Sequence, residues 1–430
     1  MKIALHNLGC KVNAYETDAI REMLESAGYT MVSFKEVADI YIVNTCTVTN
    51  IADRKSRQML HRAKKQNPQG LVVAMGCYVQ TRLDSGSAID LDIDIIIGNN
   101  KKRELLLAIE EYKKQRKKIS TVVDITKEQK YEELKLSEVS EHTRAYIKVQ
   151  DGCNQFCSYC IIPYARGRVR SRKKEDVINE IEKLSEKGCK EVVLTGIHLS
   201  SYGVDFKEKE TLLSLIQNVA KVTGIKRIRL GSLEPRIIDV QFVKSLREIK
   251  EFCPHFHLSL QSGCDATLKR MNRKYTSEEY AQKCKLLRKY FDNPSITTDI
   301  IVGFPGETQE EFNVTYKFLQ ELKLYETHIF KYSKRVGTKA ATMKEQVPED
   351  KKKERSQQLI ALAKDNQAMF EDEYQGLEVE ILIEESVSIK GEKWWLGHTK
   401  EYIKVALKAP EDIKNQIITR KMNKDLQIVH

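Results

Sequence analysis

Three cysteines with the spacing Cys153-x3-Cys157-x2-Cys160 constrain this chain more than any other feature of its sequence. Thiolates placed this way in one loop can ligate three irons of a [4Fe–4S] cluster and leave the fourth iron open to a small ligand. Zinc is the alternative, but structural zinc sites close with four ligands, and no further Cys or His lies near these three in the sequence. The motif therefore predicts an iron–sulfur cluster with one open position.

A second set of three cysteines lies in the amino-terminal part of the chain, each just after an apolar run. The runs 2–8, 40–43 and 71–75 lead into Cys10, Cys46 and Cys77. The carboxyl ends of parallel strands meet at one edge of an open α/β sheet, so the three thiols are expected to converge there. The alternative is that they are buried thiols packing as small hydrophobic groups, but their position after a strand argues against this. The pattern favours a second cluster.

The order of apolar runs predicts an α/β fold in three parts. Residues 1–112 alternate apolar runs with amphipathic stretches, which predicts a parallel sheet wrapped by helices. Residues 113–140 are charged and low in aromatic residues, which is typical of a linker. Six strand and helix units in residues 141–369 predict a partial (β/α)6 barrel, with the CxxxCxxC loop after its first strand. Short apolar runs in residues 370–430 predict a small antiparallel β domain.

Small and polar residues follow several of the predicted barrel strands, where such a fold binds its ligands. Glycine lets the backbone approach a ligand closely, and a carboxylate can bind ribose hydroxyls or an ammonium group. Each position is weak evidence alone, and their recurrence after successive strands is what makes a shared nucleoside ligand plausible. The candidate contacts are Gly196, Ser232, Glu234, Gln261, Asp299 and Gly303.

The charge of the chain favours a polyanionic partner. The formal net charge is +11, although residues 370–430 carry nine Lys or Arg against twelve Asp or Glu. A lone basic run is more often a solvated helix face, but several runs flanking reactive cysteines favour a binding surface. These runs are Arg54, Lys55 and Arg57; Arg62, Lys64 and Lys65; Arg166, Arg168, Arg170, Arg172, Lys173 and Lys174; and Lys269, Arg270, Arg273 and Lys274.

The sequence shows no sign of secretion or of a membrane anchor. Its first residues lack the long apolar core of a signal peptide, and no run approaches the twenty apolar residues of a membrane span. Ten widely spread cysteines do not form the pattern of a disulfide scaffold, and oxygen-sensitive cluster chemistry fits a reducing compartment. A cytoplasmic location without membrane contact is the expectation.

With these residues assembled, the chain resembles the radical S-adenosylmethionine (SAM) methylthiotransferase family over essentially its whole length. The segments that carry the resemblance are NLGCKVNAYET, NTCTVTN, MGCYVQ, KVQDGCNQFCSYCIIPYARG, LQSGCDATLKRMNRKYT and TDIIVGFPGET, in the family's order. The resemblance implies that residues 1–112 form the methylthiotransferase domain, residues 141–369 the radical SAM barrel, and residues 370–430 an RNA-holding TRAM domain.

Roles for individual residues follow from the same resemblance. Cys153, Cys157 and Cys160 would hold the cluster that binds SAM, with Tyr159 packed beside the adenine. Cys10, Cys46 and Cys77 would hold an auxiliary [4Fe–4S] cluster that carries the sulfur. SAM would then be used twice per turnover, as methyl donor and as oxidant. An external electron donor, of a reductase or flavodoxin type, and a sulfur source would be needed.

Two segments resemble one subgroup of the family in particular. NTCTVTNIADRKSRQ and GSLEP are similar to the subgroup that methylthiolates C2 of N6-threonylcarbamoyladenosine at position 37 of tRNA. For such a substrate, Arg54, Lys55 and Arg57 are the candidates for phosphate contacts. Three alternatives stay open: N6-isopentenyladenosine in tRNA, an aspartate of a ribosomal protein, and a non-catalytic iron–sulfur protein that binds RNA.

Overall fold

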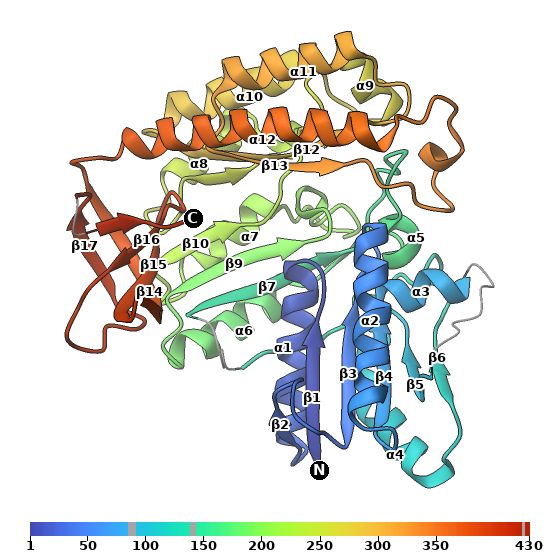
Figure 1. The fold of residues 1–430 in the computed structure, drawn as a ribbon. Helices are drawn as coiled ribbons and strands as arrows, with labels where there is room; N and C mark the ends of the chain where they lie inside the picture. Colours follow the sequence, from blue (N-terminus) through green and yellow to red (C-terminus); the bar gives the residue numbers. More distant parts are fainter. Residues whose placement is uncertain (85–91, 138–142, 424–425) are drawn as a thin grey trace.

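The computed structural model describes residues 1–84, 92–137, 143–423 and 426–430 (Figure 1). Its amino-terminal part is a parallel sheet with the strand order β2-β1-β3-β4-β5-β6. The strands are β1 (Lys2–Asn7), β2 (Thr30–Val32), β3 (Ile40–Thr45), β4 (Leu71–Gly76), β5 (Ile95–Ile97) and β6 (Ile119–Thr121).

Helices cover both faces of this sheet, which explains why its central strands β3 and β4 are buried along their whole length. Side chains of α1 (Lys11–Ser26) and α4 (Leu105–Gln115) pack on one face. Those of α2 (Asn50–Gln66) and α3 (Cys77–Asp84) pack on the other. Every residue of β3 and β4 is buried, as expected for parallel strands covered on both sides.

The central part is an open barrel built from two sheets. The first has the order β10-β9-β7-β8, and the second has the order β11-β12-β13. A parallel bridge between Leu233 and Leu258 joins the two sheets. Strand bounds are β7 (Arg144–Asp151), β8 (Arg170–Ser171), β9 (Glu191–Gly196), β10 (Arg227–Leu230), β11 (His255–His257), β12 (Ser295–Val302) and β13 (Glu326–Lys331).

The helices of this part lie outside the strands, and shorter ones follow the cysteine loop and β11 (Figure 1). They are α5 (Ile162–Arg166), α6 (Lys174–Glu186), α7 (Leu212–Val219), α8 (Val240–Arg247), α9 (Asp265–Arg270), α10 (Ser277–Tyr290), α11 (Gln309–Leu322) and α12 (Glu349–Asp372). The expected partial barrel of six parallel strands is thus confirmed. β11 is short, and beyond its end Leu258 and Ser259 still donate to the two flanking segments, at Thr297 and Leu233.

The carboxyl-terminal part is the predicted antiparallel sheet, with the order β17-β14-β15-β16-β18. Its strands are β14 (Glu378–Ile389), β15 (Glu392–Thr399), β16 (Lys404–Leu407), β17 (Ile417–Lys421) and β18 (Leu426–Ile428). The expected boundary at residues 369 and 370 falls inside α12, whose Phe370 packs into the core of this sheet. The exact domain bounds and the TRAM identity of this sheet stay predictions.

The segment expected to be a linker takes part in packing on both sides. Its β6 is an edge strand of the amino-terminal sheet, paired with β5. Leu134 and Leu136 lie in the barrel core together with Tyr15 and Ala19 of α1. Residues 138–140 of this segment lie outside the described residues. The amino-terminal sheet is therefore docked on the barrel through a shared apolar core.

A buried ionic group joins the barrel to the carboxyl-terminal sheet. Glu191 at the start of β9 accepts a hydrogen bond of 2.9 Å from Arg229, and Arg227 lies 3.6 Å from it. The two arginines also donate to backbone carbonyls of the sheet, at His398 and Lys400 among others. Burial alone would raise the pKa of Glu191, but Arg229, Arg144 and Arg227 lower it from 4.5 to about 2.

This lowered pKa predicts how stability depends on pH. Because the folded pKa lies below the unfolded one, the ion pair stabilises the protein fully above pH 4.5 and is lost as the pH falls toward 2. The shift corresponds to roughly 3 kcal/mol. We expect Glu191→Gln to lower the melting temperature at pH 7 and to flatten its dependence on pH between 2 and 4.5. Equal decreases in melting temperature at pH 2.5 and at pH 7 would contradict this account.

None of the helices in the described ranges is both long enough and apolar enough to cross a membrane.

Candidate functional site

The cysteines of the CxxxCxxC motif, called here the barrel triad (Cys153, Cys157 and Cys160), lie in a loop directly after β7. Gly152 makes this loop possible: its φ is +70°, and a Cβ there would lie 1.8 Å from the carbonyl oxygen of Arg168. Backbone hydrogen bonds then pin the loop, from Cys153 to Gly167 at 3.0 Å and from Ser158 to Met271 at 3.0 Å. The motif is held in one conformation at the carboxyl end of the first barrel strand.

The surroundings of the barrel triad suit metal ligands rather than free nucleophiles. Burial raises the pKa of Cys153 to about 11 and that of Cys160 to about 12. Thiols in such surroundings react slowly, whereas coordination to iron replaces the proton. The Nη1 of Arg273 donates to the sulfur of Cys157 at 3.3 Å. The donor set therefore fits an iron–sulfur cluster.

A further group of potential metal ligands lies in the barrel. Among the described residues, ligand atoms of His257, Asp299 and His328 lie within 4.8 Å of one another.

The predicted nucleoside contacts lie around this loop, most of them at the same rim of the barrel. Tyr159 is packed edge-on against Phe304, with ring centroids 6.4 Å apart. Glu234 lies close enough to Cys153 to raise its pKa, and it accepts a hydrogen bond of 2.7 Å from Arg236. Gly196 ends β9, Ser232 follows β10, and Gln261 and Gly303 follow β11 and β12.

Two of these contacts have other neighbours in the structure. Asp299 lies inside β12 rather than at its end, and its Oδ2 is 3.4 Å from Nε2 of His257. Gly303 has a φ of +69°, and the side chain of Lys352 packs closely against it. A Cβ at this position would lie 2.3 Å from that side chain. The remaining roles in binding SAM stay predictions.

The other three cysteines, called here the sheet triad (Cys10, Cys46 and Cys77), follow β1, β3 and β4 as expected. The loops of Cys10 and Cys46 touch, since a Cβ on Gly9 would lie 3.2 Å from the sulfur of Cys46. Burial, and then the neighbouring Cys77, raise the pKa of Cys46 to about 12. The three thiols thus lie together at the carboxyl edge of the sheet, and as a donor set they could hold a second cluster.

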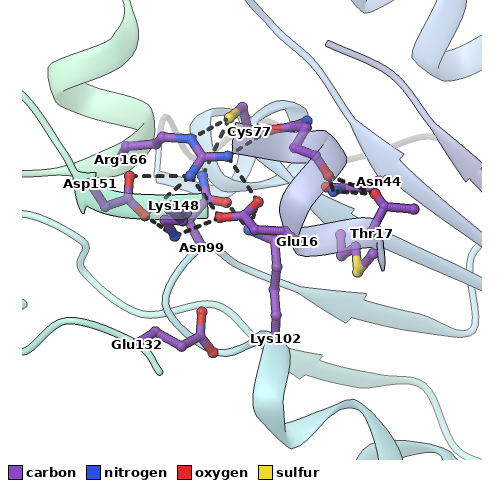
Figure 2. Close-up of polar contacts among 12 residues, drawn as sticks. Glu16, Thr17, Asn44, Cys77, Asn99, Lys102, Glu132, Lys148, Asp151 and Arg166 are labelled. Atoms are coloured by element: carbon purple, nitrogen blue, oxygen red, sulfur yellow. Dashed lines mark hydrogen bonds and ion pairs between the residues drawn. The ribbon is translucent and has the colours of Figure 1, made fainter. Parts of the chain in front are cut away.

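A buried ionic network lies beside Cys77 of the sheet triad (Figure 2). Arg166 of α5 contacts both carboxylates at its centre, Glu16 of α1 at 2.9 Å and Asp151 of β7 at 3.1 Å. Lys148 bridges the same two carboxylates, and Lys102 pairs with Glu16 at 2.9 Å. Burial would raise the pKa of Glu16, but Arg166, Lys102 and Lys148 hold it well below its ordinary value. All five side chains are at most 4% exposed.

This network corrects one expectation from the sequence. Arg166, Arg170 and Arg172 do not belong to a basic surface, because their side chains are at most 1% exposed. They pair with buried carboxylates, among them Glu180 for Arg172. Of the same run, Arg168 and Lys173 are exposed. Burial is continuous from Val169 to Arg172, around the short strand β8, and ends at Lys173.

The predicted phosphate contacts lie on α2, next to the sheet triad. Arg54 and Lys55 are exposed, and Arg57 is half-buried. The start of this helix is fixed to the segment after β13, where Asn50 donates to Lys334 and Arg335 pairs with Asp53 at 2.9 Å. A basic helix face therefore flanks the rim of the barrel.

Comparison with known proteins places these sites in a family. Residues 147–319 match the model of the radical SAM superfamily, and residues 2–98 match that of uncharacterized protein family UPF0004. A Bacillus subtilis protein named threonylcarbamoyladenosine tRNA methylthiotransferase MtaB is 43% identical over 98% of this chain and 94% of its own length. The chain belongs to the radical SAM methylthiotransferases.

A second relative in this methylthiotransferase family is named for a different substrate. The tRNA-2-methylthio-N(6)-dimethylallyladenosine synthase of Clostridium novyi is 35% identical over 87% of this chain and 84% of its own length. Among solved structures, the radical SAM methyltransferase TsrM from Kitasatospora setae covers 79% of this chain and 77% of its own, with a TM-score of 0.58 and 15% identity. That likeness supports the fold alone.

Because the protein belongs to this family, it is an enzyme that uses SAM and a [4Fe–4S] cluster. The sequence pointed to both triads but not to Arg166 as a neighbour of Cys77. No local pattern marks this arginine, because it lies at the end of the short helix α5 and its partner Glu16 is distant in sequence.

Proposed function

We propose that this enzyme methylthiolates C2 of N6-threonylcarbamoyladenosine at position 37 of tRNA, using two [4Fe–4S] clusters. The barrel triad holds the cluster that binds SAM, and the sheet triad holds the auxiliary cluster. Two SAM molecules are used per turnover. A reductase or flavodoxin-type protein supplies the electron, and sulfur comes from a separate source. Because its substrate is tRNA, we place the enzyme in the cytoplasm.

The observation that carries this proposal is the contact between an arginine of the barrel and a cysteine of the sheet triad. Asp151 lies just ahead of Cys153, and Arg166, which pairs with Asp151, also donates to the sulfur of Cys77 at 3.3 Å. A barrel residue thus contacts a sulfur of the sheet triad, and its partner Asp151 lies two positions before the first cysteine of the barrel triad. Ligand sets joined in this way suit a reaction in which a single base meets both sites.

The substrate explains why such a site is needed. No side-chain acid or base removes the hydrogen at C2 of an adenine at a useful rate. With its clusters and SAM bound, the site supplies the one-electron chemistry for that C–H bond, together with the sulfur and methyl groups. The chain's own residues hold the ligands, and Tyr159 packs beside the adenine of SAM. The target base stands in a single-stranded loop, so it can enter the barrel without melting a duplex.

Sequence similarity supports the threonylcarbamoyl substrate over its rival. The relative named for threonylcarbamoyladenosine is 43% identical, whereas the one named for dimethylallyladenosine is 35% identical. The segment NTCTVTNIADRKSRQ, which begins at the end of β3 and runs into α2, points the same way. The isopentenyladenosine reaction is the second candidate, because it would keep both cysteine triads and change only the pocket.

A competition experiment tests this choice. The protein is reconstituted anaerobically with iron and sulfide, then given SAM, a reductant and equal amounts of two tRNAs. One carries N6-threonylcarbamoyladenosine, and the other carries N6-isopentenyladenosine. We expect the 2-methylthio nucleoside almost entirely from the first tRNA. Product from the second alone would establish the rival substrate, and no product from either would overturn the proposal.

The basic face of α2 predicts a salt-dependent affinity for tRNA. Phosphate contacts release counterions, and each one contributes about 0.7 to 0.9 to the slope of log affinity against log salt. We expect the triple variant Arg54→Ala, Lys55→Ala, Arg57→Ala to reduce that slope by about 2 and to weaken binding at low salt. A matched variant on α10, with Lys283, Lys285 and Lys289 changed to Ala, serves as control. Equal slopes for the two variants would exclude α2 from the tRNA surface.

A further inference from the structure

One arginine of the barrel reaches all three loops of the sheet triad. Arg166 lies just after the barrel triad in sequence and has no exposed side-chain surface. Its Nε donates to the sulfur of Cys77 at 3.3 Å, and its Nη2 donates to Oδ1 of Asn13 at 2.6 Å (Figure 2 shows the contact with Cys77). The Asn99 amide donates to the same sulfur at 3.5 Å.

Asn13 connects Arg166 to the other two cysteine loops. Its Nδ2 donates to the carbonyl of Leu8 at 2.7 Å and to that of Thr45 at 3.2 Å. Leu8 precedes the Gly9–Cys10 turn, and Thr45 directly precedes Cys46. Arg166 therefore contacts Cys77 directly and the loops of Cys10 and Cys46 through one amide.

The charge of the network also suits a ligated cluster. Among the described residues, Lys102, Lys148 and Arg166 form ion pairs with two carboxylates, Glu16 and Asp151, which leaves an excess of one positive charge within this group. Adding the flanking Arg170 and Glu132 leaves the same excess. A buried charge needs a counter-charge. Three thiolates leave a net negative charge on a [4Fe–4S] cluster, and Cys77 lies where that charge would meet Arg166.

We propose that Arg166 is a positioning residue for the sheet triad, which holds the three cysteine loops in place and makes the bound cluster easier to reduce. The proposal rests on the second cluster of the proposed function. Hydrogen bonds and positive charge beside a ligand sulfur stabilise the more negative, reduced state of a cluster. Since Arg166 belongs to the barrel, the sheet triad is complete only when the amino-terminal sheet is docked there.

The test uses the full-length chain with Cys153, Cys157 and Cys160 all changed to Ala, so that iron at the sheet triad is observed alone. Into this parent we introduce Arg166→Lys, which keeps the charge but loses the Nε–H and the forked geometry. The control is Arg172→Lys, because Arg172 is equally buried and pairs with Glu133 and Glu180 but contacts no cysteine. Iron per chain, the electron paramagnetic resonance spectrum and the midpoint potential are measured without tRNA.

We expect Arg166→Lys to lower iron occupancy several-fold or, where the cluster is retained, to shift its midpoint potential to more negative values. Arg172→Lys should match the parent in all three measurements. An unchanged spectrum and potential in Arg166→Lys would overturn the proposal, as would equal losses in the two variants, which would indicate a purely structural role.

A second variant covers the case in which Arg166→Lys does not fold. Asn13→Ala keeps the ion pairs of Arg166 and removes only its link to the loops of Cys10 and Cys46. Lower iron occupancy in Asn13→Ala supports the proposal, and parent-like occupancy overturns it. If the parent itself takes up no iron at the sheet triad, the second cluster fails and the inference with it. If the iron occupancy and midpoint potential behave as expected but the tRNA reaction fails, the proposed function is wrong and the role of Arg166 is still supported.

Discussion

Changing Cys153 to Ala is expected to abolish the reductive cleavage of SAM, leaving 5′-deoxyadenosine at the level of a reagent blank. Cys153 is buried directly behind β7, and its backbone is pinned to Gly167, so no other side chain can take its place. A cluster with only two thiolate ligands is not held at this site. Liquid chromatography of the reaction with SAM and a reductant measures the product.

The matched control for this change is Cys189→Ala. Cys189 is also buried, at the turn before β9, but it lies in neither triad, and its thiol donates to the carbonyl of Glu191 at 3.3 Å. The Cys189→Ala change should lower the melting temperature and leave 5′-deoxyadenosine formation intact. Undiminished cleavage of SAM in Cys153→Ala would show that the barrel triad is not the radical site.

Cys46→Ala is expected to separate the two halves of the reaction. The sheet triad loses a ligand while the barrel triad is untouched, so SAM cleavage continues and the 2-methylthio product disappears. Iron should fall from about eight to about four atoms per chain, as expected for the loss of one of two four-iron clusters. Iron analysis, 5′-deoxyadenosine and the modified nucleoside are measured on the same reconstituted sample.

The contrary result for Cys46 is equally clear. Full methylthiolation by a less stable protein would mean that the sheet triad is only structural, with its thiols packed as small hydrophobic groups. Loss of both products would point instead to a folding defect shared by the two sites. A thermal melt of the variant distinguishes that case, because Cys46 lies in a loop and not in the core of the sheet.

Much of the fold could be predicted because its signals are local. β3 and β4 each begin with an apolar run and end directly before a cysteine, and the first barrel strand ends at the CxxxCxxC loop. The parts that could not be predicted depend on distant partners. β2, β5, β6 and β18 are three-residue strands, and segments that short carry too little periodicity to stand out from loops.

The same limit applies to the site. The thiols were found from their spacing, but Arg166 was interpreted as part of a basic surface. Its partner Glu16 is 150 positions away in sequence, on a helix of another domain. A charged residue pairs inside a protein only when the fold supplies its counter-charge, so a one-dimensional count of charge assigns such residues to the surface. Arg54 and Lys55 of α2 were predicted as surface residues, and both are exposed.

The most direct test of the central claim is nucleoside mass spectrometry of tRNA from cells that lack this gene, with the intact gene or its Cys153→Ala form restored. The account predicts that 2-methylthio-N6-threonylcarbamoyladenosine disappears, that its unmodified precursor accumulates, and that only the intact gene brings it back. An unchanged level of this nucleoside, or the loss of the isopentenyl derivative in its place, would contradict the proposed function.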